Sequence, residues 1–120
     1  MERTHYKQQP SKMEVDKQRL SYRLDIQVEQ LDDGEVEYSA YEVCISQPYS
    51  QNKLIEVAMT TLFGNDHENK LINEYNSAVL GLYHDEETKA EKINRYTDFL
   101  TERAALKADI ERVCADNGIN

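Results

Sequence analysis

The sequence is poor in the residues that build common nucleotide-binding and redox motifs. Its four glycines are dispersed along 120 residues, so it contains neither a phosphate-binding loop nor a dinucleotide fingerprint. Its two cysteines, Cys44 and Cys114, lie too far apart to form a closely spaced metal or redox pair. We therefore expect two buried or half-buried thiols rather than a disulfide.

Long apolar runs are also missing. No stretch of about 18 apolar residues occurs, and the first 12 residues contain no apolar segment of the kind found in signal peptides. We therefore expect no transmembrane helix, no membrane partner and no signal peptide. The expected location is the cytoplasm, or the virion if the protein is a phage structural component.

Lys and Arg are scarce relative to Asp and Glu, which gives a net charge of −9. The first 20 residues carry five Lys/Arg against three Asp/Glu, so the remaining hundred carry −11. Because nucleic-acid binding depends on cations that neutralise phosphates, we expect no direct contact with DNA or RNA. The 39% of hydrophobic residues is nevertheless sufficient for a folded chain, and the length fits one domain.

The first half of the chain predicts a tail followed by a β-hairpin. Residues 1–18 show no sustained period, which predicts a flexible tail ahead of a single domain over 19–118. Residues 20–29 alternate apolar and polar side chains, which is typical of a half-buried strand. Gly34 then completes a turn into a second strand over 35–46.

The apolar phase of the second strand slips, which leaves two interpretations. One is a β-bulge near Ser39 and Ala40, and the other is a strand buried on both faces. We favour the bulge, because it keeps Glu37 and Glu42 away from the core. Pro48 cannot donate to a ladder and ends the strand.

Helical spacing replaces alternation in the second half. A first helix is predicted to end at Gly64, and a second, reaching Leu82, to begin at Asn65 with a capping box. A third is predicted to begin at Thr88 with another capping box and to stop at Asn117 and Gly118. The fold class is therefore α+β, with an N-terminal β-hairpin followed by three α-helices, the last one long.

That last helix, ending near Cys114, has roughly 27 residues and spans about 40 Å, more than a compact domain of this size requires. We expect part of it to project or to pack on another chain. Phe99, Leu106 and Val113 form a stripe that repeats every seven residues over only two heptads. An antiparallel helical hairpin within the domain explains this stripe equally well.

No group of residues predicts catalysis, a metal site or a cofactor site. His67 and His84 belong to no zinc or calcium motif, and we interpret them as solvated residues at the ends of the second helix. Cys44 is expected to be packed within a strand, which disfavours a nucleophilic thiolate. We therefore expect no enzyme.

Six residues are candidates for contacts with a partner. Tyr38, Tyr41 and Tyr49 are grouped on the second strand and the loop after it, where large rings with polar tips serve either a core or an interface. The heptad stripe of the last helix supplies the other three, Phe99, Leu106 and Val113.

Helix-packing positions of the second half carry a resemblance to a known group of proteins. They comprise the run KLINEYN at 70–76, the run LGL at 80–82, and Tyr96, Phe99 and Arg103. Over residues 53–114 the chain resembles small hypothetical proteins of phages and integrated elements of Bacteroides-type bacteria. That group has no agreed activity, so the resemblance implies a virion, assembly or host-interaction protein and carries over no catalytic residue.

The sequence has no catalytic, metal or cofactor motif, its two-stranded hairpin would be only marginally stable alone, and its last helix is long. Together these features favour a structural or accessory protein that works by protein–protein contact, including contact between its own copies. The alternative is an acidic inhibitor that imitates nucleic acid and binds a basic host protein. A small-molecule enzyme is a third hypothesis, which would require a deep pocket with converging polar groups.

Overall fold

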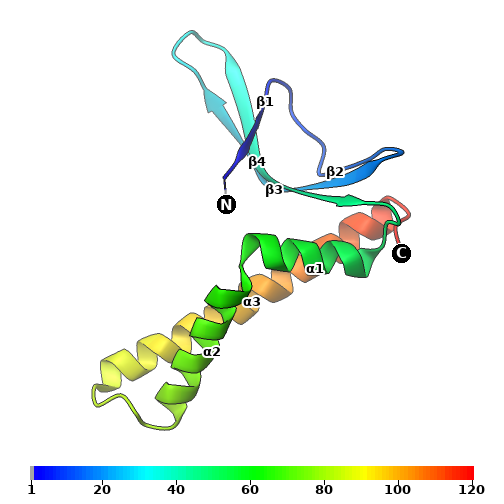
Figure 1. Cartoon of the computed structure of the whole chain (residues 1–120). Helices are drawn as coiled ribbons and strands as arrows, with labels where there is room; N and C mark the ends of the chain where they lie inside the picture. The colour runs from blue at the N-terminus through cyan, green and yellow to red at the C-terminus, as the bar shows by residue number, and fades with distance from the viewer. Residues whose placement is uncertain (1) are drawn as a thin grey trace.

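The computed structural model of the chain describes residues 2–120. Four strands form one antiparallel sheet in the order β1-β4-β3-β2 (Figure 1). The strands are β1 (Thr4–Tyr6), β2 (Met13–Val15), β3 (Arg19–Gln30) and β4 (Val36–Ser46). The helices are α1 (Gln51–Leu62), α2 (Asn65–Val79) and α3 (Glu86–Asp116). The predicted α+β class is confirmed.

Residues 2–18 differ from the predicted tail, because they contribute two strands to the sheet. β1 pairs with β4 and β2 pairs with β3, so the predicted hairpin of β3 and β4 forms the centre of a four-stranded sheet. Met13 of β2 is buried in the main core. Strands of three residues are too short to show an alternating pattern, and they form here by pairing with longer neighbours.

The β-bulge predicted near Ser39 and Ala40 occurs at that position, but the prediction was wrong about which strand carries it. The extra residue lies in β3, between Leu24 and Gln27. Within this irregularity Asp25 has a φ of 56°, in the left-handed region that Asp tolerates better than most residues. β4 is continuous and carries buried residues on both faces, as the other interpretation of its pattern required.

The capping boxes predicted to start at Asn65 and Thr88 are also wrong. α2 begins after Gly64, whose φ of 77° turns the chain from α1 into α2 without a side-chain cap. α3 begins after Asp85, whose carboxylate accepts a hydrogen bond of 2.9 Å from the hydroxyl of Thr88. The predicted end of the last helix is confirmed, since Asn117 is its C-cap.

One face of the sheet packs on α1 and on the C-terminal part of α3 (Figure 1). The core side chains come from β2, β3, β4 and both helices: Met13, Leu20, Tyr22, Val43, Ile45, Leu54, Ala58, Leu106, Ile110, Val113 and Cys114. Tyr22 is completely buried, and its hydroxyl donates to the carboxylate of Asp109 in α3. Lys12, just before β2, pairs with the same carboxylate at 2.8 Å. Asp109 therefore joins the sheet to the helix layer.

The molecule is elongated, because α2 and the N-terminal part of α3 lie beyond the sheet (Figure 1). Its radius of gyration is 18.1 Å, whereas a compact chain of this length has about 14 Å. With 31 residues, α3 spans about 46 Å. Neither α3 nor any other helix within residues 2–120 is long and apolar enough to cross a membrane.

α2 and α3 form the antiparallel helical hairpin that the sequence suggested. The rings of Tyr75 and Tyr96 lie 4.8 Å apart between the two helices. Ion pairs join Glu74 to Lys92 at 3.4 Å and Glu68 to Arg103 at 3.2 Å. The early part of α2 thus faces the later part of α3, which leaves the loop between the two helices at the far end of the molecule.

Asp109 is expected to make stability depend on pH. Burial alone raises the pKa of Asp109, but hydrogen bonds from Lys12 and Tyr22 hold it below its usual value. Its contribution to stability is therefore present above the unfolded-state pKa of about 3.9 and is lost as the pH falls through the lower folded-state pKa.

We predict that Asp109→Asn lowers the free energy of unfolding at pH 7 by about 1–3 kcal/mol and flattens its acid dependence. Urea unfolding measured from pH 7 into the acid range tests both effects. Asp116→Asn, in the exposed last turn of α3, is the matched control. An unchanged acid slope in Asp109→Asn would contradict the assignment.

Candidate interaction surfaces

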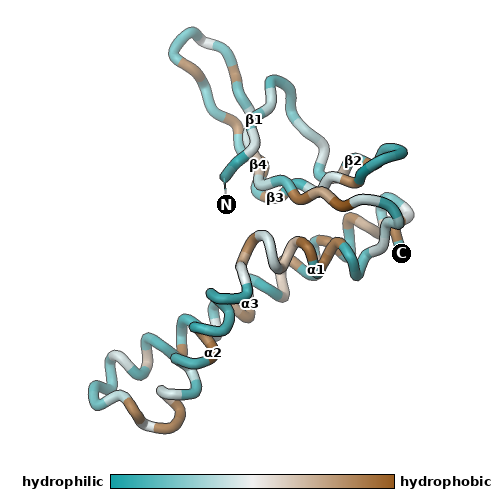
Figure 2. The backbone as a smooth tube through the Cα atoms, viewed as in Figure 1, coloured by the Kyte–Doolittle hydropathy of each residue, from teal (hydrophilic) through white to brown (hydrophobic). Residues whose placement is uncertain are grey.

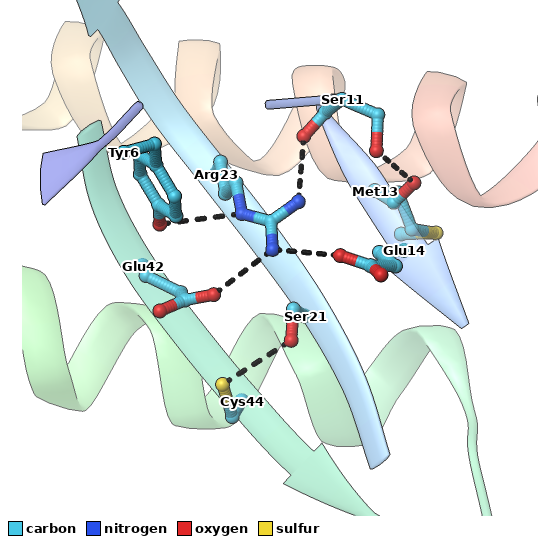
Figure 3. Close-up of polar contacts among 8 residues, drawn as sticks. All are labelled: Tyr6, Ser11, Met13, Glu14, Ser21, Arg23, Glu42 and Cys44. Carbon is cyan, nitrogen blue, oxygen red and sulfur yellow. Dashed lines mark hydrogen bonds and ion pairs between the residues drawn. The ribbon is translucent and has the colours of Figure 1, made fainter. Parts of the chain in front are cut away.

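A buried guanidinium lies at the centre of a polar cluster on the sheet face turned away from the helices (Figure 3). Arg23 is 6% exposed and follows Tyr22, which points to the opposite face. Its nitrogens donate to Glu14 at 2.9 Å, the Ser11 carbonyl at 3.1 Å, Glu42 at 3.2 Å and the Tyr6 hydroxyl at 3.3 Å. Burial lowers the pKa of Arg23, but the bonds to Glu14 and Tyr6 outweigh burial and raise it, so the group stays charged.

These contacts hold the connection between β1 and β2 against the sheet. The two strands lie at opposite edges, so the connecting residues 7–12 span the width of the sheet. Tyr6 stands at the start of this segment and Ser11 near its end, and both bind Arg23. An open hollow of about 600 Å³ lies between the segment and Arg23.

The chemistry of the cluster is that of a structural ion pair. Both carboxylates are engaged by Arg23, and the thiol of Cys44 lies 3.4 Å from the hydroxyl of Ser21. No nucleophile is paired with a general base among the side chains drawn in Figure 3. Within residues 2–120, no three His, Cys, Asp or Glu side chains are grouped to hold a metal ion. His67 and His84 are both exposed, as predicted, but only His67 lies at an end of α2, because His84 lies in the loop before α3.

The structure does not bring the three predicted tyrosines together. Tyr38 and Tyr41 are both half-buried, but they point to opposite faces of β4. The guanidinium of Arg3 lies 4.6 Å from the centre of the Tyr41 ring. The hydroxyl of Tyr49 donates to the Asp16 carbonyl at 2.8 Å, beyond the end of β4.

The three predicted residues of α3 are buried within the chain. Phe99 is 4% exposed, and its ring packs edge-on against Phe63 at 5.3 Å. Leu106 and Val113 are 4% and 6% exposed and belong to the main core. The seven-residue repeat is therefore satisfied inside one chain, and a partner would have to contact other parts of α3.

Beyond the irregularity in β3, the two central strands continue as an arm, residues 26–38, which has only two strands beyond the pairing of Tyr6 with Tyr38 (Figure 1). Val28 is 61% exposed and Val36 is 41% exposed, and they lie on one face of the arm. Between Leu24 and Asn52 the sequence has seven Asp/Glu and no Lys or Arg. The arm is therefore acidic with exposed apolar side chains.

A second exposed apolar group lies at the far end of the helical hairpin, where Figure 2 shows apolar residues in the turn after α2. Val79, Leu80 and Leu82 are 56%, 74% and 65% exposed. We call these three residues the tip. Sequence reasoning missed the tip because it placed Leu82 in the second helix, whereas the helix ends at Val79 and Gly81 turns the chain with a φ of 75°. The glycine between Leu80 and Leu82 was the sequence feature that could have indicated the end of the helix and an exposed turn.

We predict that Arg23→Gln lowers the free energy of unfolding by about 2–4 kcal/mol, since it removes a buried charge that four groups bind. Amide hydrogen exchange over residues 7–12 should accelerate, because their anchor is lost. Arg19→Gln, on an exposed position of the same strand, should change stability by less than about 0.5 kcal/mol. Equal exchange in the two variants would show that Arg23 does not hold this segment.

The two cysteines should differ in reactivity. Cys44 is exposed on the outer face, contrary to the packed position expected for it, while Cys114 is buried, which raises the pKa of its thiol. A thiol reagent should therefore modify one group rapidly in the native protein and the second only in denaturant. Cys44→Ser should abolish the rapid phase, and a rapid phase that persists in this variant would refute the assignment.

Comparison with known proteins gives no relative from which to assign a family. No protein-family model matches the chain, and neither a curated protein nor a solved structure matches it. A functional assignment therefore depends on the surfaces described above.

Proposed function

We propose that the protein is a non-enzymatic structural or accessory protein that works through protein–protein contacts, including contacts between its own copies. The observation that carries this proposal is the exposure of large apolar side chains at two projecting parts of an elongated chain. They are Val28, Leu31 and Val36 on the arm and Val79, Leu80 and Leu82 at the tip.

These side chains add nothing to the chain's own cores while they face water. A partner that covers them removes apolar surface from water, which is the main driving force of association. The resemblance to proteins of phages and integrated elements supports the same class, since it implies assembly or host interaction. The proposed location is the cytoplasm, or the virion for a phage component.

The acidic arm favours a second candidate, an inhibitor that binds a basic host protein. The arm has five carboxylates and no Lys or Arg among residues 26–38, which gives it a field that attracts a cationic surface. Binding of this kind weakens as salt rises, because screening shortens the range of the attraction. Binding driven by apolar contacts is far less sensitive to salt.

Affinity capture from an extract of the source cell tests the proposal. A tagged chain, mixed with its untagged form, should retain a stoichiometric partner, which is either its own copy or another protein. Replacing Val28 and Val36 by Ser, or Leu80 and Leu82 by Ser, should release the partner that uses that surface. Retention that high salt abolishes and that requires the arm would favour the inhibitor.

Two results would count against a contact protein. One is a chain that retains neither its own copy nor any other protein in stoichiometric amount. The other is retention that both pairs of Ser substitutions leave unchanged. Because all four positions are exposed, we expect each variant to fold. Circular dichroism and thermal unfolding check this before the variant is used.

A further inference from the structure

The side of α3 opposite the core carries no charged residue for about five turns. Its six residues are all exposed and are Ala90, Asn94, Thr97, Thr101, Ala104 and Ala108, which we call the α3 seam. They recur at alternating intervals of four and three, the spacing of the contact positions of a coiled coil. Small side chains at such positions allow a second helix to approach closely.

The polar groups of the seam are compatible with burial. The hydroxyl of Thr97 donates to the carbonyl of Ile93 at 3.0 Å, and that of Thr101 to the carbonyl of Thr97 at 3.1 Å. Because both donors are satisfied within the helix, a covering helix would contact the methyl groups without leaving these hydroxyls unpaired. Asn94 is the one amide of the seam, and a single Asn at such a position fixes the register of paired helices.

An apolar groove adjoins the seam between α1 and α3. It encloses about 390 Å³, and its apolar lining consists of Ile55, Met59, Leu100 and Ala104. Ala104 also belongs to the seam, so the two surfaces are continuous. Lys107 flanks the groove with positive charge, and so does Arg103, which also pairs with Glu68 of α2.

The tip has the complementary chemistry. Its apolar residues Val79, Leu80 and Leu82 are followed, after Tyr83 and His84, by the carboxylates of Asp85, Glu86 and Glu87. Glu86 and Arg103 lie seventeen positions apart on one continuous helix, a distance of about 26 Å. The tip therefore cannot reach the groove of its own chain, and a second copy is required to bring the two together.

We propose that two copies pair their α3 helices antiparallel along the seam, so that the tip of each copy, with the carboxylates of Glu86 and Glu87 beside it, fills the groove of the other. This inference rests on the proposed function and identifies the partner as a second copy. The register that sets Asn94 opposite Thr97 of the other copy also sets Glu87 opposite Ala104, beside Arg103. The contact is two-fold, so it closes as a dimer.

Solution mass measured by light scattering tests the pairing directly. The full chain should have twice its 14.0 kDa mass, and Thr97→Lys, which places a charge in the seam, should be a monomer. Glu102→Lys, on another exposed side of α3, is the matched control and should remain a dimer. A wild-type chain that stays monomeric would overturn the pairing while leaving contacts with other proteins untouched.

Charge exchange separates this surface from any other dimer contact. Glu86→Lys and Lys107→Glu should each weaken the dimer by about tenfold or more, because each sets like charges against one another at both ends of the pair. Mixing the two variants should restore the dimer as a heterodimer, since both contacts are then attractive. A dimer that tolerates both charge changes and Thr97→Lys would refute pairing through the α3 seam. The proposed function as a protein that works by protein–protein contacts would not be affected by that result.

Discussion

The arrangement of the sheet depends on one buried charge. Arg23 is removed from water almost completely, and a charge in that position is costly unless carboxylates and hydrogen-bond acceptors surround it. Those groups come from β1, β2, β4 and the segment between β1 and β2. Strands of three residues gain little from pairing alone, so this shared charge adds to the pairing with β4 and β3 in holding β1 and β2 on the sheet.

β3 organises both layers because adjacent residues of a strand point to opposite faces. Tyr22 reaches Asp109 of α3 on one face, and Arg23 collects the N-terminal segment on the other. Both contacts lie in the first half of β3, near the helices. The second half of β3, beyond Asp25, has no helix beneath it, and this is why the arm leaves its valines in water.

Periodicity predicted the elements that bury a regular stripe, while features set by tertiary contacts escaped it. The alternation of β3 and the helical spacing of α1, α2 and α3 identified those elements, because each repeats over several residues. The left-handed backbone of Asp25 and the start of α3 at Asp85 instead of Thr88 are each set by a single residue. No repeating pattern of the sequence predicts such a feature. Among the candidate surfaces, the seven-residue stripe from Phe99 to Val113 was predicted as a partner contact, but its residues are buried in the chain. The uncharged seam lies on the opposite side of the same helix.

Net charge decides where copies of this chain can meet. At −9, two copies repel one another over most of their surface, so a stable contact needs a face where charge is absent or balanced. The arm is not such a face, because it has no Lys or Arg to offset its carboxylates and would repel another copy. It would attract a basic partner instead. The seam meets the condition by having no charge, and Lys107 and Arg103 beside the groove offset the carboxylates of Glu86 and Glu87 of the other copy. The length of α3 acquires a physical reason in this arrangement, since only a helix that extends past the sheet places an acidic end and a cationic groove far enough apart to meet in two copies.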